Sequence, residues 1–454
     1  MRVPRIPPSP NDLMTKIISG PDGPKRFLNI SQMQIGPAPG GKYRHWDIVR
    51  RLDPPQGLTP EEWWLGIKLA RQCLHQELPI SDRFGKPFRY ATPDIVFRLL
   101  HQIDRDAAGA IRGSEQITNP DTRETYLIKS LFEESITSSQ LEGATTTREV
   151  ARDMLRQRRS PKDRSEQMIY NNYDAMRFVR QLGSEPLTVE AIIELQRILT
   201  SDTLDDPGAA GRLRKSDEVI HVVDQFTGDV LHIPPDATEL DERLAGICCM
   251  ANDTDDDPFI HPVIRSILLH FQMGYDHPFV DGNGRTARAL FYWSMRRHGY
   301  WLTEFVSISS ILTRAPTQYG ESYLYTETDD NDATYFIIYQ LRVLIRAIDR
   351  LHIYLARKEE ELRRTREQLQ RSAVLRAVLN HRQLAVVNHA LKNPLFTYTI
   401  QSHRGSHNVS YETARSDLAG LAELRLLDKG KVGRAFVFTA PRELHERIQQ
   451  TSGV

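Results

Sequence analysis

Apolar side chains recur every three to four residues through most of the stretch from residue 121 to residue 300, and this spacing constrains the fold most strongly. The pattern predicts helices at residues 164–182, 186–201, 236–252, 261–276 and 285–298. Residues 124–142 carry Leu127, Leu131 and Ile136 at the same spacing, and Gly143 is a suitable end for that helix. We therefore predict a mainly α-helical fold.

One segment within the helical region has the pattern of strands instead. Val219 to Val223 and Val230 to Ile233 flank a turn at Thr227-Gly228-Asp229, which predicts a β-hairpin. A single hairpin among helices has no larger sheet to join. We expect it to form a flap on the surface.

The two ends of the chain differ from this helical region. Residues 1–40 are rich in proline and glycine and predict an extended arm or loop. Residues 334–372 predict a long helix whose charged end is typical of a solvated linker, with a coiled-coil contact as the alternative. Residues 375–440 predict a winged helix-turn-helix, with helices near 383–392 and 410–424 and two strands around Lys429 to Gly433.

The composition of the chain limits which classes of protein it can belong to. Lys plus Arg and Asp plus Glu are each 59, so the net charge gives no overall attraction to nucleic acid or to a membrane. There is no apolar run long enough to span a membrane, and the first residues lack the apolar core of a signal peptide. Cys73, Cys248 and Cys249 suggest no disulfide framework or zinc site, so we expect buried thiols in the cytoplasm.

The segment from His277 to Arg288 carries the strongest chemical signal. Pro278 disfavours helix at His277, so the chain should turn there. Gly282-Asn283-Gly284 then allows successive amides to face one concavity, at the positive end of the next helix. This arrangement is typical of a phosphate site.

Four side chains in this segment suit phosphoryl chemistry. Arg285 and Arg288 lie three apart on one helix face and suit phosphate oxygens. Asp281 is placed to hold Mg²⁺, and His277 can accept a proton near neutral pH. Taken singly, each of these residues is more often structural. Their combination within twelve residues predicts in-line attack of a hydroxyl on phosphorus.

These twelve residues, HPFVDGNGRTAR, resemble the signature HPFx[DE]GNGRxxR of the Fic family at every fixed position, and the helical pattern is similar over residues 125–345. The resemblance implies a Fic helical core and a nucleotidyltransferase that moves AMP from ATP, with Mg²⁺, to a Ser, Thr or Tyr hydroxyl of a target protein. It implies that His277 is the base and Asp281 the metal ligand. The implied phosphate-binding residues are Gly282, Asn283, Gly284, Arg285 and Arg288.

Three further features follow from the resemblance. Ser138 to Gly143 is similar to the family's inhibitory motif [ST]xxxE[GN], which implies that Glu142 binds Arg288 and blocks the γ-phosphate site. The hairpin is similar to the family's flap, which pairs with the target's backbone. The implied contacts are His221, Val222, Val223, Leu231 and His232 for the target, and Tyr319 for adenine.

We therefore divide the chain into four parts: an N-terminal extension (1–110), the Fic domain (111–350) with its inhibitory helix at about 124–143, a linker helix (351–374) and the winged helix (375–454). Lys429, Lys431 and Arg434 suit phosphate contact, whereas Glu412, Asp417 and Glu423 oppose it. The alternative function is a DNA-binding regulator whose Fic core acts mainly on itself or removes AMP. A homodimer is a further partner that the sequence leaves open.

Overall fold

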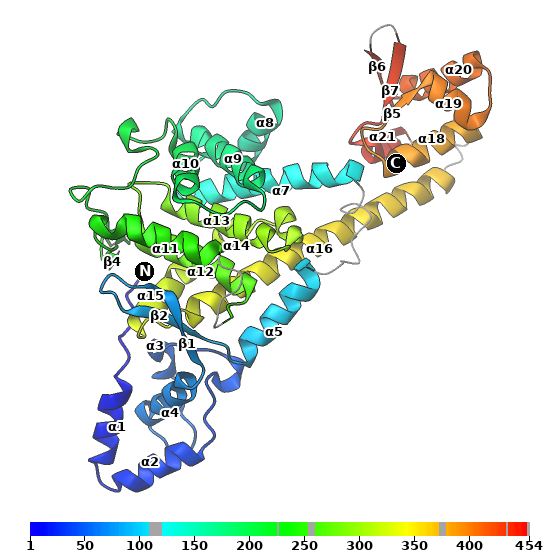
Figure 1. The fold of residues 1–454 in the computed structure, drawn as a ribbon. Helices are drawn as coiled ribbons and strands as arrows, with labels where there is room; N and C mark the ends of the chain where they lie inside the picture. The colour runs from blue at the N-terminus through cyan, green and yellow to red at the C-terminus, as the bar shows by residue number, and fades with distance from the viewer. Residues whose placement is uncertain (109–119, 225–226, 253–258, 372–377, 433–434, 452–454) are drawn as a thin grey trace. The chain divides into compact units, whose positions relative to one another are not determined.

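The computed structural model describes residues 1–108, 120–224, 227–252, 259–371, 378–432 and 435–451. The fold is mainly helical, as predicted (Figure 1). The chain forms two compact units, residues 1–111 with 130–348 and residues 112–129 with 349–454. Helices α7 (Pro120–Leu141) and α16 (Thr334–Arg371) contribute residues to both units.

The first unit is built on a group of central helices. Helix α12 (Pro262–Asp276) packs against α11 (Leu240–Asn252) and α13 (Asn283–Arg297), and α13 also packs against α9 (Arg164–Leu182) and α10 (Val189–Thr200) (Figure 1). Nearly every side chain of α12 and α13 is buried. A helix that is buried on all sides gives the loop at its end a rigid base.

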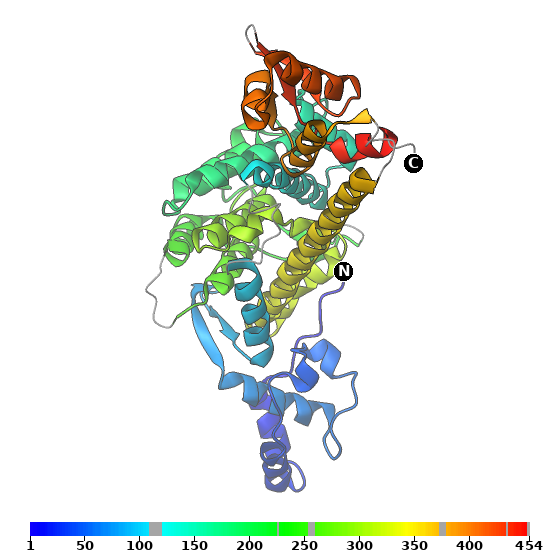
Figure 2. The same ribbon diagram turned by 90° about the vertical axis from the view of Figure 1, so that its right-hand side faces the viewer.

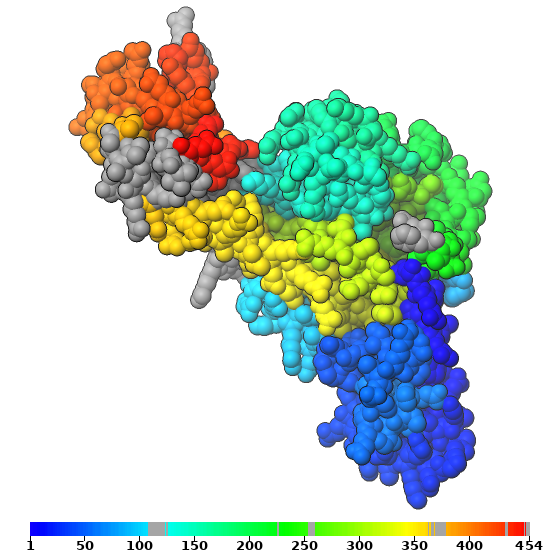
Figure 3. All heavy atoms as spheres, turned by 180° about the vertical axis from the view of Figure 1, so that it is seen from behind, coloured from blue at the N-terminus to red at the C-terminus, as the bar shows by residue number. Residues whose placement is uncertain are grey.

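All five helices predicted from periodicity are present here, with ends that differ by four residues at most. The inhibitory helix predicted at 124–143 corresponds to α7. The hairpin is also present, with β3 (Val222–Val223) antiparallel to β4 (Val230–His232). Three more helices complete the region: α8 (Arg148–Gln157), α14 (Ser309–Leu312) and α15 (Pro316–Thr328). Residues around α8 and α9, coloured teal, form a rounded lobe on the face shown in Figure 3.

The N-terminal segment differs from the prediction of an extended arm. It contains α1 (Pro10–Ile18) and α2 (Gly23–Gln32), which lie at one end of the first unit (Figures 1 and 2). Prolines open both helices, where the amide that proline lacks would have had no partner. Helix α4 (Pro60–Gln72) begins with a complete capping box, formed by Thr59 and Glu62.

The remainder of this N-terminal region was not predicted in detail. Short helix α3 (Trp46–Val49) precedes α4, and α5 (Asp94–Ile103) follows a hairpin of β1 (His75–Ser81) and β2 (Pro87–Ala91). A small apolar cluster that includes Trp63, Trp64 and Ile67 holds the first helices together.

The second unit has its own core and a three-stranded antiparallel sheet of order β5-β7-β6. Its elements follow α16 in the order α18 (His381–Lys392), β5 (Thr397–Thr399), α19 (Ile400–His407), α20 (Tyr411–Glu423), β6 (Asp428–Val432), β7 (Ala435–Thr439) and α21 (Leu444–Thr451). This order contains the predicted helices and the predicted pair of strands. Arg434 lies outside the described residues.

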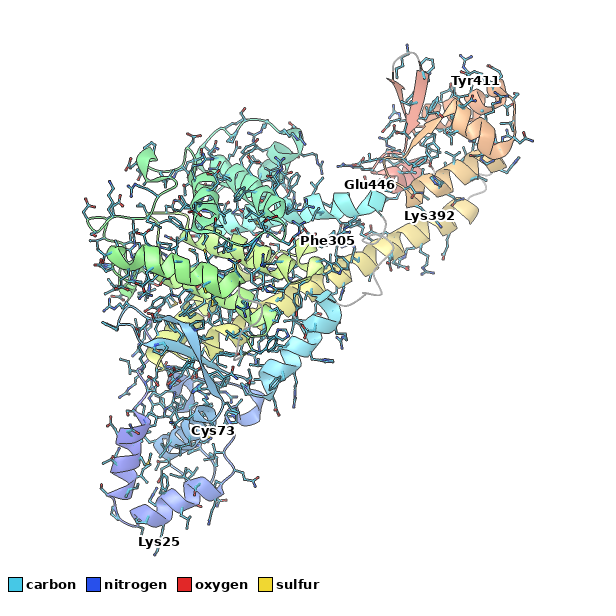
Figure 4. The ribbon with its side chains drawn as sticks, viewed as in Figure 1. Lys25, Cys73, Phe305, Lys392, Tyr411 and Glu446 are labelled. Atoms are coloured by element: carbon cyan, nitrogen blue, oxygen red, sulfur yellow. The ribbon has the colours of Figure 1, made fainter. Side chains whose placement is uncertain are left out.

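Two features of α20 bear on its surface. Tyr411, at its start, is 52% exposed (Figure 4). Asp417, which the sequence placed among surface acids, is buried and accepts hydrogen bonds from Arg382 (2.7 Å) and Asn380 (2.7 Å). Its charge is therefore neutralised within the unit.

The cysteines only partly match the prediction of buried thiols. Cys248 is buried, whereas Cys73 and Cys249 are exposed, and all three are unpaired. Within the described part of the chain, no helix is both long enough and apolar enough to cross a membrane.

Candidate active site

The predicted phosphate loop joins the two most buried helices. Helix α12 ends at Asp276 and α13 begins at Asn283. His277 and Gly282 both adopt left-handed backbone conformations, with φ of 42° and 88°. The Asn283 side chain fixes the loop between them, since it accepts from the Phe279 amide (2.9 Å) and donates to the Phe279 carbonyl (2.8 Å).

His277 is held in one tautomer. Its Nδ1 is hydrogen-bonded to the Gly274 carbonyl, which can only accept, so Nδ1 carries the proton and Nε2 has a free lone pair. Burial, together with the charge of the neighbouring His232, lowers the pKa of His277 to about 4. The ring is therefore neutral near pH 7 and offers a base at Nε2.

The first turn of α13 presents amides that have no partner within the helix. The first helical hydrogen bond runs from the Thr286 amide to the Gly282 carbonyl (2.9 Å), so the amides of Asn283, Gly284 and Arg285 precede it and have no acceptor within the helix. The Gly282 amide donates to Asp281 (2.6 Å). The free amides and the helix dipole favour an anion at this point.

Both arginines of the loop are buried, with 1% of each residue exposed. Arg285 donates to the Leu199 carbonyl (2.9 Å) and to Asp281 (3.2 Å). Arg288 donates to Ser138 Oγ (2.9 Å) and to Glu142 Oε1 (2.8 Å). Among the described residues, Arg285 Nε and the Nη1 group of Arg288 have no acceptor. An anionic ligand would supply one.

The Glu142 carboxylate lies against Arg288 and Gly284. Glu142 follows the last residue of α7, and a Cβ atom added to Gly284 would lie 2.2 Å from Glu142 Oε1, so a larger residue at position 284 would require the carboxylate to shift. Burial has the largest single effect on Arg288 and opposes its charge, but Glu142, Tyr319 and Glu134 together raise the pKa of Arg288. The structure thus brings together Ser138, Glu142 and Arg288, as the resemblance implied.

A buried carboxylate that the sequence analysis missed anchors the same helix face. Glu134 lies one turn before Ser138 and two turns before Glu142. It accepts from Tyr292 (2.9 Å), Ser307 Oγ (2.7 Å), and the amide (3.2 Å) and hydroxyl (2.5 Å) of Ser309. These bonds tie α7 to α13 and to the segment before α14.

Asp281 is the carboxylate available for a metal, and its side chain is 39% exposed. Within the described residues, no group of three or more His, Cys, Asp and Glu side chains is placed to hold a metal ion. A single carboxylate beside a phosphate site is how proteins usually hold Mg²⁺, because phosphate and water oxygens complete its coordination. The donor set therefore fits Mg²⁺ bound together with a nucleotide.

The residues predicted to contact the target and adenine differ in how far they are buried. His221 and Val223 are exposed, and Val222 and Leu231 are half-buried. The His232 side chain is buried and is hydrogen-bonded to the Tyr275 carbonyl, so it does not face a target. Tyr319 bonds to His270 (2.8 Å), and burial raises its pKa although the nearby Arg288 lowers it.

Arg214, which no sequence pattern indicated, joins the loop to the base of the flap. Its Nε donates to the His277 carbonyl (2.8 Å), and its amide donates to the Pro278 carbonyl (2.9 Å). Its guanidinium also donates to the Pro235 carbonyl, just after the flap. A single side chain thereby fixes both ends of the flap against the catalytic loop.

Comparison with known protein families matches residues 186–295 to the Fic/DOC family. The chain is 29% identical over 270 residues to the protein adenylyltransferase Fic of Drosophila melanogaster, which covers 57% of this chain and 51% of that protein. It is 28% identical over 181 residues to the Nematostella vectensis protein of the same name, with 38% and 39% covered. The chain thus spans about half the length, or less, of these curated relatives.

A solved structure shares the fold. The crystal structure of a Fic family protein from Desulfovibrio desulfuricans G20 superimposes with a TM-score of 0.51 and 16% identity, over 78% of this chain and 98% of that chain. The similarity at this identity concerns the fold alone. The match of residues 186–295 to the Fic/DOC family includes the loop between the two buried helices, so in this region the chain is similar to that family.

Proposed function

We propose that this chain is a protein adenylyltransferase that transfers AMP from ATP to a Ser, Thr or Tyr hydroxyl of a target protein. The observation that carries the proposal is the position of His277, neutral and with Nε2 free, beside the unpaired amides that begin α13. The curated relatives named protein adenylyltransferase Fic support the same activity.

In the proposed complex, the phosphates of ATP accept hydrogen bonds from the amides of Asn283, Gly284 and Arg285. Arg285 and Arg288 add charge, and their unpaired N–H groups gain acceptors. Asp281 holds Mg²⁺, which neutralises phosphate charge. Tyr319 remains our candidate for adenine contact. These groups act by positioning and by charge stabilisation, which dominate phosphoryl-type transfer.

The chemical step needs one proton transfer and one displacement. His277 Nε2 takes the proton of the target hydroxyl as its oxygen attacks the α-phosphorus. The bond between the α-phosphorus and the bridging oxygen breaks, and pyrophosphate leaves. The target reaches this position by adding its backbone to the flap at His221, Val222, Val223 and Leu231.

Glu142 inhibits this reaction by holding the anion position first. Its carboxylate lies over Gly284 and binds Arg288, where a phosphate group of ATP would otherwise bind. The positive end of α13 stabilises the carboxylate for the same reason that it would stabilise a phosphate. We therefore expect ATP to bind in an unreactive position until Glu142 moves away.

The test compares Glu142→Gly with wild type, using α-labelled ATP, Mg²⁺ and a protein extract. We expect Glu142→Gly to increase AMP incorporation at least tenfold. The matched control is Glu185→Gly, because Glu185 is exposed and also follows the end of a helix. His277→Ala in the Glu142→Gly background should abolish transfer but keep ATP binding in calorimetry.

Equal incorporation by Glu142→Gly and wild type would remove the inhibitory role of Glu142. Incorporation that survives His277→Ala would remove the base. If AMP appears only on the chain itself, or if the chain removes AMP from labelled protein, the alternative of a regulator that acts on itself or reverses the modification is favoured.

A second candidate function for the C-terminal unit, which we propose is a winged helix, is DNA binding. The ammonium groups of Lys429 and Lys431 both lie over the Phe436 ring, at 4.6 and 5.0 Å from its centre, and so share one face of the sheet. Asp417, an acid that the sequence counted against DNA contact, is buried. Two lysines on one face suit phosphate contact.

The whole chain can be tested for this function in a mobility-shift assay with duplex DNA at about 50 and 200 mM salt, between which the Debye length is roughly halved. We expect Lys429→Ala with Lys431→Ala to lose the shift, and the exposed Lys392→Ala on α18 to retain it. A shift that none of these changes affects would refute a role for this face. For the compartment, we propose the cytoplasm, where the three thiols stay reduced.

A further inference from the structure

The C-terminal end of α12 is closed by side chains that come from outside the helix. The last carbonyls of a helix have no partner within it. Here the Gly274 carbonyl accepts from His277, and the Tyr275 carbonyl lies 2.7 Å from His232 Nε2. The imidazole of His232, on β4 of the flap, thus caps the C-terminal end of α12, directly before His277.

Both ring nitrogens of His232 face acceptors. Nε2 contacts the Tyr275 carbonyl, and Nδ1 lies 2.8 Å from a carboxylate oxygen of Glu327 on α15. A neutral imidazole carries a single N–H, so both bonds form to an ionised Glu327 only when the ring carries two protons. A cation at the end of α12 also complements the negative end of the helix dipole.

We propose that His232 is a positioning residue for the catalytic base: as an imidazolium held between Glu327 and the Tyr275 carbonyl, it keeps His277 unprotonated and fixes the end of α12. The inference rests on the proposed function for its catalytic meaning, but its physical content concerns only the protonation of two histidines. It gives His232 a role different from the target contact that the resemblance implied.

The geometry supports an effect of one ring on the other. The centres of the His232 and His277 rings lie 6.4 Å apart, and the His232 side chain is buried, so solvent screens their interaction weakly. Burial and the charge of His232 both lower the pKa of His277. A base that stays unprotonated near neutral pH is ready to accept the proton of a hydroxyl.

Other charged groups face the two rings and set the balance. His277 also faces Glu142 from the end of α7, which favours its protonation, and Arg214 from the segment before the flap, which opposes it. His232 faces Glu327 from α15 and Asp276 from α12. Because Asp276 is bound by Gln272 and Arg243, Glu327 is the carboxylate that directly pairs with His232.

The position of His232 also couples the flap to the base. β4 belongs to the strand pair on which we expect the target backbone to bind. Its last residue, His232, is hydrogen-bonded to α12, which ends just before His277. A target that pairs with the flap therefore binds to a strand that is hydrogen-bonded to α12, the helix before His277.

The experiment follows the two histidine rings by NMR, with carbon-labelled histidine in the full chain and without nucleotide. In wild type we expect His232 to show the ring shifts of an imidazolium at pH 7 and His277 those of the Nδ1–H tautomer. His232→Gln keeps an N–H for the Tyr275 carbonyl but removes the charge. Coulomb's law at 6.4 Å then predicts that the pKa of His277 rises by about 0.5 to 2 pH units.

The control is His221→Gln, an exposed histidine of the same flap, which should leave the His277 titration in place whatever it does to target binding. In the Glu142→Gly background, the acidic limb of kcat/KM against pH should move upward with His232→Gln by the same amount as the NMR titration. A role limited to folding would lower activity at all pH values without moving this limb.

A neutral His232 ring in wild type at pH 7 would overturn the proposal, and so would a His277 titration that His232→Gln leaves unchanged. If His232→Gln does not fold, the wild-type ring shifts still decide the first point, and His232→Asn decides the second. The titration needs no transfer reaction. A chain without transferase activity would therefore refute the proposed function while leaving this inference open to its own test.

Discussion

Replacing Glu134 by glutamine is expected to loosen the helix that carries the inhibitory glutamate. Glu134 is 2% exposed, and its Oε2 accepts from Tyr292, Ser307 and the Ser309 amide, whereas its Oε1 accepts only from the Ser309 hydroxyl. Glutamine can keep an oxygen at the Oε2 position and place its amide nitrogen at the other. The Ser309 hydroxyl can then rotate to accept, so the three remaining bonds lose only their charge.

The magnitude follows from the hydrogen bonds. Hydrogen bonds to a charged group contribute about 1.5–3 kcal/mol each and neutral ones about 0.5–1.5 kcal/mol, so three bonds that lose their charge in Glu134→Gln should reduce the free energy of unfolding by roughly 3–4 kcal/mol. Glu134→Leu removes the carboxylate that all four donors share and should cost more, on the order of 4–6 kcal/mol. These values allow the two variants to be ranked.

Urea denaturation followed by tryptophan fluorescence measures the loss of stability, and hydrogen exchange measures the protection of α7. Because Glu134 and Glu142 share one face of α7, faster exchange in this helix should accompany higher AMP incorporation. Glu133→Gln is the control, since Glu133 pairs with Arg148 and Arg152 on the exposed side. If Glu134→Gln and Glu134→Leu both match wild type in stability and exchange, the network does not anchor the helix.

Three further outcomes are expected. Gly284→Ala places a methyl group 2.2 Å from Glu142 Oε1 and 3.0 Å from Arg288, where we propose that a phosphate of ATP binds. The affinity for ATP in calorimetry should therefore fall at least about tenfold, and an unchanged Kd would contradict the tight fit. Burial raises the pKa of Asp276 to about 7, above its unfolded value of 3.8. The protonated carboxyl therefore stabilises the fold fully below pH 3.8, and this contribution is lost as pH rises towards 7. Between these pH values Tm should fall less for Asp276→Asn than for wild type, and equal slopes would exclude Asp276 as the cause. Asp417→Ala removes the acceptor of Arg382 and His403 and should lower the urea midpoint of the C-terminal unit, whereas Glu412→Ala on the exposed side of α20 should not; equal midpoints would show that the buried carboxylate contributes nothing.

The catalytic loop was predictable because its signals are local. Pro278 follows the end of α12 and glycine permits the turn at Gly282, so twelve consecutive residues predict the shape of the loop, whereas its chemistry stays a prediction. The inhibitory contact between Glu142 and Arg288 spans 146 residues and came from the family resemblance. No rule of periodicity connects residues so far apart.

The features that were missed depend on distant partners. Arg214 and Glu134 look like ordinary charged residues in sequence, and their roles appear only when His277, Pro278 and Ser307 to Ser309 come close in the fold. Residues 1–40 were wrongly expected to be extended because proline was taken as a breaker, whereas it begins α1 and stands in the first turn of α2. The β1–β2 hairpin was missed because His75 to Ser81 contains a proline and few apolar residues.

The carboxylate that we propose as the inhibitor, Glu142, is part of the chain on which it would act. Because Glu142 follows directly on α7, its local concentration beside Arg288 is the same in a dilute solution as in a crowded cell. Soluble anions therefore have to compete with a group that never diffuses away. In the reaction proposed here, the switch between the idle and the working enzyme depends on bending or displacing one helix end, and any partner able to pull that end by a few ångströms would act as an activator without touching the nucleotide.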